Sequence, residues 1–185
     1  MAATAYNLNH LQAATNDGSP TYVDINYATT FEPSITQESD SFRADGQVVI
    51  TAQGAPEGAG SLGFGSYDVD SFAVLTGGTS STSGSGGTAI ERLEIPADYT
   101  PPSVILVAWL PNVDGNSTSA GLRITVPNAK VNMPSTQFGQ ETWSEFTADF
   151  SFAADTNDVM LIFEDMATAP TFTSGVIPTN LTPPA

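Results

Sequence analysis

The chain has 185 residues, which is enough for one domain with a sizeable hydrophobic core and leaves no room for a second catalytic domain. A composition that is 40% hydrophobic, with 16 Gly and 13 Pro, indicates a globular protein of strands and loops and argues against a helical bundle. Twenty acidic residues against four Lys and Arg give a formal net charge of −16, so the clustered cations that nucleic acid or an anionic membrane surface requires are missing.

Cysteine is absent and His10 is the only histidine, which removes disulfides, thiolate chemistry and the usual ligands of transition metals. A Ser-His-Asp triad would need His10, which we expect in a weakly patterned N-terminal arm. No apolar run approaches the roughly 18 residues of a membrane-spanning helix, and the N-terminus lacks the basic start and apolar stretch of a signal peptide. We therefore expect a protein made in the cytoplasm, with no cofactor, no metal and no membrane partner.

The first part of the chain predicts an arm followed by strands. Residues 1–20 carry turn formers without a sustained period, which predicts an N-terminal arm. Val23, Ile25 and Tyr27 alternate with polar residues, as in a strand that buries one face. We expect strands over 21–29 and 47–53, a loop over 32–40, a break at 54–60 and a short strand over 61–67.

One short helix is predicted next. Asp68 and Ser71 can satisfy the free amide groups of a first helical turn, and Gly77 can end the helix, which gives a helix over about 68–76. The residues that follow are almost entirely Gly, Ser and Thr, which predicts a flexible or partner-ordered loop over 77–88.

Strands are easier to predict in the second half. The run from Val104 to Trp109 is apolar on both faces, so we expect it to be central in the sheet. From 141 to 154 the even positions Phe146, Ala148, Phe150 and Phe152 are apolar, while the odd positions include Glu141, Glu145 and Asp149, so one long strand presents a core face and an acidic face. We expect strands over 89–95, 104–110, 121–126, 142–153 and 159–164, within a body that covers 21–167 and precedes a Pro-rich C-terminal arm over 168–185.

A β-sandwich glycosidase is the enzyme that this composition tolerates best, because it needs only two carboxylates, about 5–9.5 Å apart. Glu141 and Glu145 share a strand face but lie about 13 Å apart at four residues' separation. Carboxylates on neighbouring strands stay open as an alternative. The acidic turns at Asp114 and Asp155 lack the terminal Glu of a twelve-residue calcium loop, and we interpret both as hairpin turns. We expect no enzyme and no catalytic residue.

Several segments, taken in order, resemble a major tail tube protein of a long-tailed bacteriophage, of the non-contractile kind. They are Ser41-Phe-Arg-Ala-Asp-Gly-Gln-Val-Val49, the strand-to-helix passage 63–77, the strand Trp143-Ser-Glu-Phe146 within 140–152, and the strand 157–164. The likeness covers roughly 21–169 and lies in the pattern and order of elements more than in any invariant motif.

The resemblance implies a mainly β structure, a β-sandwich or barrel with one short packed helix and extended N- and C-terminal arms. It also implies hexameric rings that stack into a hollow tube, a virion tail component through which DNA is ejected. The implied partners are further copies of the chain, a tape-measure protein, and tail terminator and tip proteins. Candidates that face the lumen are Glu141, Glu145 and Asp149, and candidates for contacts between subunits are Gly77, Ser83, Gly87, Phe172 and Ile177.

An acidic bore is physically suited to such a conduit, because it repels phosphate and binds DNA nowhere. The same charge makes subunits repel one another, so assembly should favour salt, and unpaired sheet edges offer backbone pairing between neighbours. Two other interpretations stay open. The acidic face can be an ordinary solvated surface of a monomer, and the chain can be a carbohydrate-binding or adhesive β-sandwich of a fibre, decoration or surface protein.

Overall fold

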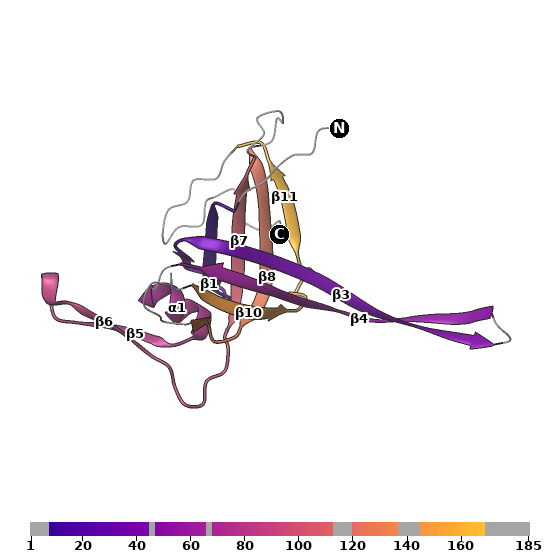
Figure 1. The fold of residues 1–185 in the computed structure, drawn as a ribbon, viewed down its shortest axis with the longest axis horizontal. Coiled ribbons are helices and arrows are strands. Elements are labelled where there is room, and N and C mark those ends of the chain that lie inside the picture. Colours follow the sequence, from indigo (N-terminus) through magenta and orange to yellow (C-terminus); the bar gives the residue numbers. More distant parts are fainter. Residues whose placement is uncertain (1–7, 45–46, 66–67, 113–119, 137–144, 169–185) are drawn as a thin grey trace.

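The computed structural model describes residues 8–44, 47–65, 68–112, 120–136 and 145–168 (Figure 1). The chain is mainly β with one short α-helix, as the composition and apolar periodicity predict. Its elements are β1 (His10–Thr15), β2 (Tyr22–Asp24), β3 (Ala28–Ala44), β4 (Gln47–Phe64), α1 (Val69–Thr76), β5 (Thr79–Ser83), the 3-10 helix Gly86–Thr88, β6 (Ile90–Glu94), β7 (Ser103–Pro111), β8 (Gly121–Val131), β9 (Ser135–Thr136), β10 (Phe146–Phe152) and β11 (Ile162–Met166). No helix in the described part of the chain has the length and apolar character needed to span a membrane.

Strand β8 is where the main sheet divides into two layers. One edge of β8 pairs with β7, while its other edge pairs with β11 at 121–125 and with β10 at 129–131. Because β10 and β11 share one edge of β8, they diverge from it. Strands β2, β1, β7, β8 and β11 form one layer, and β10, β4 and β3 cross over it as the second (Figure 1).

The core between the layers contains the apolar residues that the sequence predicts for β7 and β10. Strand β7 lies between β1 and β8, as its two apolar faces predict. In β10 the even positions from Phe146 to Phe152 are buried and the odd positions are exposed, which confirms the predicted alternation. The other buried members of the core are Leu11, Ala13, Ile25, Leu62, Phe64, Phe72, Leu75, Val104, Leu106, Ala108, Ile124, Val126, Ala129 and Val131.

Two glycines of β4 make room for two phenylalanines of β10. Gly58 and Gly60 are the cross-strand partners of Phe152 and Phe150, and a Cβ atom at either glycine would collide with the partner's ring. The rings therefore lie across the glycine backbone and shield it from water. The Phe150 ring continues across the sheet and stacks on Phe31 of β3, with the ring centroids 5.7 Å apart.

Helix α1 confirms the predicted helix and both of its ends. The Ser71 amide donates a hydrogen bond to the Asp68 carboxylate (3.1 Å), and Gly77 ends the helix in the left-handed conformation at φ 66°. Phe72 packs edge-on against Phe64 and Phe146, with centroids 5.5 and 5.1 Å away. The helix thus closes one end of the core.

The prediction of an N-terminal arm over 1–20 is wrong for residues His10–Thr15, because they form β1, a strand inside the first layer. Strand β1 pairs with β2 on one side and with β7 on the other, where His10 lies opposite Trp109. Residues Leu11 to Ala14 are all buried. A strand buried on both faces shows no alternation of polar and apolar residues, so no periodic pattern marks β1 in the sequence.

The loop predicted over 32–40 and the break predicted at 54–60 are also wrong, because both lie within the long hairpin of β3 and β4. Pro33 suggested a loop, yet it is tolerated in β3 because β3 lies at an edge of the sheet in the described part of the chain. A proline at an edge removes no ladder hydrogen bond when its nitrogen faces outward.

The outer part of this hairpin extends well beyond the body of the molecule (Figure 1). The last residue of β4 that pairs with β10 is Gly58, opposite Phe152, and its partner on β3 is Ile35. Beyond that point β3 and β4 pair only with each other over the described residues. We call residues 36–44 and 47–57 the distal ribbon.

A second hairpin, β5–β6, projects on the opposite side of the molecule from the distal ribbon (Figure 1). The predicted flexible loop over 77–88 is therefore wrong for 79–83, which form β5 and pair with β6. All five residues of β5 are exposed, which is why their composition resembled that of a loop.

Replacing Gly60 by Ala should destabilise the fold. The new Cβ would collide with the Phe150 ring and lie 2.6 Å from the Glu32 carbonyl oxygen. We expect a loss of about 1–3 kcal/mol in the free energy of unfolding, measured by urea denaturation. The control is Gly87→Ala, because a Cβ there meets nothing within 4 Å. Equal stability of the two variants would contradict the proposed fit between ring and glycine.

Candidate functional site: the acidic face and the projecting hairpins

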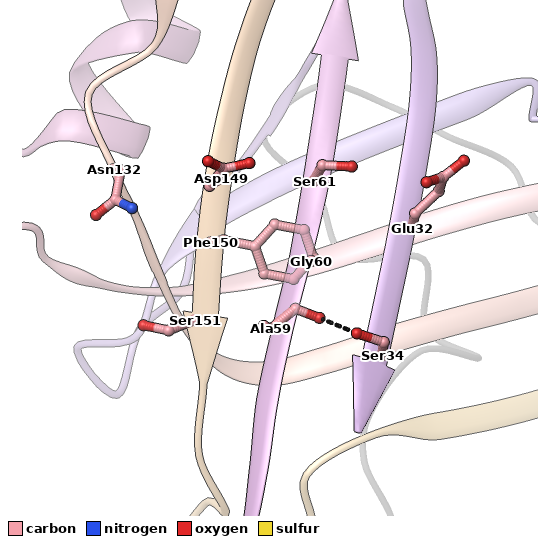
Figure 2. A pocket seen from close by; sticks show the side chains of 9 residues that line it. All are labelled: Glu32, Ser34, Ala59, Gly60, Ser61, Asn132, Asp149, Phe150 and Ser151. Atoms are coloured by element: carbon pink, nitrogen blue, oxygen red, sulfur yellow. Dashed lines mark hydrogen bonds between the residues drawn. The ribbon is translucent and has the colours of Figure 1, made fainter. Parts of the chain in front are cut away.

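The outer side of the β10, β4 and β3 layer carries carboxylates and small polar groups. Asp149 lies opposite Ser61 of β4, and Ser61 lies opposite Glu32 of β3, so these residues form a row across three strands (Figure 2). We call this outer surface the acidic face. It comprises Glu32, Ser34, Ala59, Ser61, Glu145, Thr147, Asp149 and Ser151.

The lumen candidates Glu145 and Asp149 both lie exposed on the acidic face, while Glu141 lies outside the described residues. Asp149 is part of β10, whereas Glu145 directly precedes the strand. The Thr29 hydroxyl donates a 2.6 Å hydrogen bond to Glu145 Oε1, which fixes the carboxylate beside β3. Gly63 lies beneath this pair, since a Cβ there would come within 2.8 Å of the Thr29 hydroxyl oxygen.

A shallow groove of about 530 Å³ runs over the acidic face (Figure 2). The small residues Ala59, Gly60 and Ser61 lie along the middle of the groove. Glu32 and Asp149 lie on its two sides. Phe150 is the aromatic residue of the lining, and it is only 2% exposed. The groove therefore offers carboxylates and hydroxyls but no exposed ring on which a sugar could stack.

Few cations neutralise this surface. Arg123 is 4% exposed and is held by Glu164, to which its Nε donates at 2.6 Å, so it is not available at the surface. Lys130 is exposed at the border of the acidic face, opposite Ser151. Arg92 is exposed on β6, on the projecting hairpin. The described part of the acidic face itself contains no Lys or Arg.

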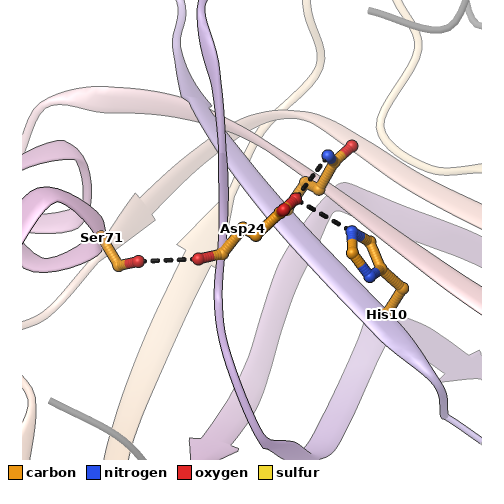
Figure 3. Close-up of polar contacts among 4 residues, drawn as sticks. His10, Asp24 and Ser71 are labelled. Carbon is orange, nitrogen blue, oxygen red and sulfur yellow. Dashed lines mark hydrogen bonds and ion pairs between the residues drawn. The ribbon is translucent and has the colours of Figure 1, made fainter. Parts of the chain in front are cut away.

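His10 lies close to an aspartate and a serine, but the three do not form a catalytic triad (Figure 3). His10 Nε2 lies 2.9 Å from Asp24 Oδ1, which also accepts a 2.7 Å hydrogen bond from Gln12. The Ser71 hydroxyl lies 2.8 Å from the backbone oxygen of Asp24 and 2.6 Å from the Asp68 carboxylate. Asp24 thus separates the histidine from the serine, and the imidazole cannot act as the base that a nucleophilic serine needs.

Asp155 forms a turn rather than a calcium loop. Its Oδ1 accepts hydrogen bonds from the amides of Asn157 and Val159, at 2.8 and 2.9 Å. The Val159 amide is the main reason why the pKa of Asp155 lies below its ordinary value, with Asn157 adding to the effect. The other acidic turn, at Asp114, lies outside the described residues. Within the described ranges no three His, Asp or Glu side chains cluster as metal ligands would.

Two of the candidates for contacts between subunits, Ser83 and Gly87, fall on the β5–β6 hairpin. Gly77 ends α1, Ser83 is the last residue of β5, and Gly87 lies in the 3-10 helix that joins β5 to β6. Phe172 and Ile177 lie outside the described residues. The prediction missed that β4 continues through 54–60 beside β10, although the Gly58-x-Gly60 pattern matched by Phe150-x-Phe152 could have indicated a glycine strand covered by an aromatic one.

Comparisons with known proteins give no family assignment. No protein-family model matches the chain, and no curated protein is significantly similar to it in sequence.

The lowered pKa of Asp155 predicts a pH-dependent contribution to stability. A carboxylate whose pKa falls on folding stabilises the fold above its ordinary pKa of 3.8, and this contribution is lost as pH falls through the lower folded value. Asp155→Asn should therefore lower the melting temperature at pH 7, and the difference from the parent should vanish once the pH is below the lowered pKa of the folded state. Asp158→Asn removes a charge from the same turn and isolates the effect of the hydrogen bonds. A difference that persists at low pH would contradict the assignment.

Proposed function

We propose that the chain is a structural subunit that self-associates into rings, and that these rings stack into the hollow tail tube of a long-tailed bacteriophage. The observation that carries this proposal is the distal ribbon. It leaves the body of the molecule and has no covering element among the described residues. The kind of assembly that we propose, a tube of stacked hexameric rings, comes from the resemblance of the sequence to tail tube proteins.

The distal ribbon has the properties of an arm that another molecule covers. A two-stranded ribbon is at best marginally stable in water without a third strand or a packed layer. Over the described residues of the ribbon, β3 and β4 pair only with each other, and no third strand or packed layer joins them. A neighbouring subunit supplies the missing surface. The ribbon thereby links copies of the chain.

The acidic face supports the conduit part of the proposal. Its exposed groups are carboxylates, hydroxyls and small side chains, with Lys130 as an exposed cation at the border, so the face offers DNA phosphates few groups and no large ring to hold them. If this face lines the bore, its carboxylates repel the DNA phosphates and its small side chains do not obstruct the passing DNA. A tape-measure protein, tail terminator and tip proteins are the further proposed partners, in host cytoplasm during assembly and in the virion tail afterwards.

A carbohydrate-binding or adhesive domain accounts for fewer of these features. The groove lacks an exposed ring, and the exposed aromatic side chains Tyr27, at the turn before β3, and Phe163, on β11, do not line it. Such a domain has no use for the distal ribbon. A tube subunit uses both the ribbon and the acidic face.

The purified chain should form rings or tubes that are visible by negative-stain electron microscopy. Assembly should be stronger at high salt, because salt screens the repulsion between subunits with a net charge of −16. Replacing residues 40–52 by Asn-Gly should leave monomers, because it removes most of the ribbon. Ser39 lies opposite Gln53, so a two-residue turn can join them.

The melting temperature of the shortened chain is the control. It should stay near that of the parent, because the ribbon packs against no other described element. Parent protein that stays monomeric at high concentration, even with an initiating tail complex present, would refute the proposal.

Charge reversal on the acidic face tests the bore. Glu145→Lys combined with Asp149→Lys should still permit assembly but slow or block DNA ejection, because the new cations bind phosphate. The neutral pair Glu145→Gln with Asp149→Asn should give an intermediate ejection rate. Infectivity that is unchanged in the lysine variant would place this face on the outside of the tube.

A further inference from the structure

Two exposed strands on opposite flanks of the molecule carry matching side chains. Strand β6 presents Ile90 and Arg92 on one face, two residues apart. Strand β11 presents Phe163 and Asp165, also two residues apart. Alternate residues of a strand are about 6.6 Å apart on the same face, so an apolar group and a charge are spaced alike on both strands. The charges are opposite in sign.

On β6 these side chains extend into solvent. Ile90 is 66% exposed and the Arg92 side chain 70% exposed. Arg92 lies 2.9 Å from Glu94, but an ion pair this exposed contributes little and can be exchanged for another. Strand β6 pairs only with β5 in the described part of the chain, so one of its edges is open.

On β11 a buried ion pair sets which residues point outward. Glu164 lies opposite Arg123 of β8 and binds its guanidinium group, so the neighbouring residues of β11 take the other face. Phe163 lies opposite Ile124, a core residue, yet Phe163 is 59% exposed. The core-facing side of β8 therefore continues onto β11 without a covering layer among the described strands, and Asp165 stands exposed beside it.

We propose that β6 of one copy docks on β11 of a second copy, with Ile90 against Phe163 and Arg92 beside Asp165. This inference rests on the proposed self-association and assigns one of its contacts. The two strands lie on opposite flanks, with β5–β6 projecting on one side and β11 bordering the upright strands on the other (Figure 1). A contact between different surfaces of identical subunits repeats from copy to copy and closes into a ring when the rotation permits.

The charge of the chain makes this contact selective. With four Lys and Arg against twenty acidic residues, most pairs of surfaces on two copies repel. Among the described cations, Arg123 is buried in its ion pair, so a docking surface with an accessible cation next to an exposed apolar side chain is uncommon on this molecule. Strand β6 has such a cation, Arg92, next to the apolar Ile90. Strand β11 has a carboxylate, Asp165, next to the apolar Phe163.

A charge swap in the full-length chain tests the contact. Arg92→Asp and Asp165→Arg should each weaken association about tenfold, because each places like charges together. The double variant Arg92→Asp with Asp165→Arg should return to within about threefold of the parent, because it restores an opposite pair in reversed order. Sedimentation velocity over a concentration series measures all four proteins, and the single-variant effects should shrink at high salt.

Asp98→Arg is the matched control, since it makes the same charge change at an exposed position outside both strands and should not weaken association. Melting temperatures should agree among all the variants, because the substituted side chains are exposed. Single variants that associate like the parent, or a double variant as weak as the singles, would overturn the contact while leaving tube assembly standing. A parent chain that never associates would overturn the contact and the proposed function together.

Discussion

The packing of the β10 phenylalanines over the β4 glycines is the contact on which the rest of the structure depends. Phe150 and Phe152 reach across Gly60 and Gly58, and this fit joins β10 to β4 within the second layer, while the backbone pairing of β10 with β8 joins that layer to the first. Because β10 is anchored to β8 on one side and to β4 on the other, the same contact fixes where the β3–β4 hairpin leaves the body. The direction of the distal ribbon and the outward aim of the acidic face are both consequences of it.

Electrostatics limits how copies of this chain can meet. The body buries one arginine in an ion pair with Glu164, and this pair also orients β11. The surface is left strongly acidic, so contacts between copies must come from backbone edges, apolar side chains and the few accessible cations. The two projecting hairpins provide such groups at opposite sides of the molecule. In the proposed tube, the acidic face then takes no part in contacts between copies and can line the bore, where DNA passes without being bound.

The parts of the fold that local physics decides could be predicted from the sequence. The helix with its Asp68 and Gly77 ends, the central strand β7 and the alternation along β10 all follow from capping and periodicity. Strand β1 could not be predicted because burial on both faces removes alternation, and the continuous pairing of β3 with β4 was obscured by Pro33 and by Gly58 and Gly60, whose cover comes from another strand. Of the candidate site, the exposure of Glu145 and Asp149 was predictable, whereas Phe163 stands out only once β11 is seen to lie beyond the covering layer.

The position of β1 also governs when a subunit can finish folding. His10 pairs with Trp109, so the first strand of the chain finds its central neighbour only after roughly 100 further residues have been made. Until β7 leaves the ribosome, β1 has no partner on that side, and β8, β10 and β11 follow later still. A chain still being synthesised therefore lacks both completed layers. Under the proposed self-association, a copy would become competent to associate only once the strands through β11 have been made, which would keep unfinished copies out of the assembly.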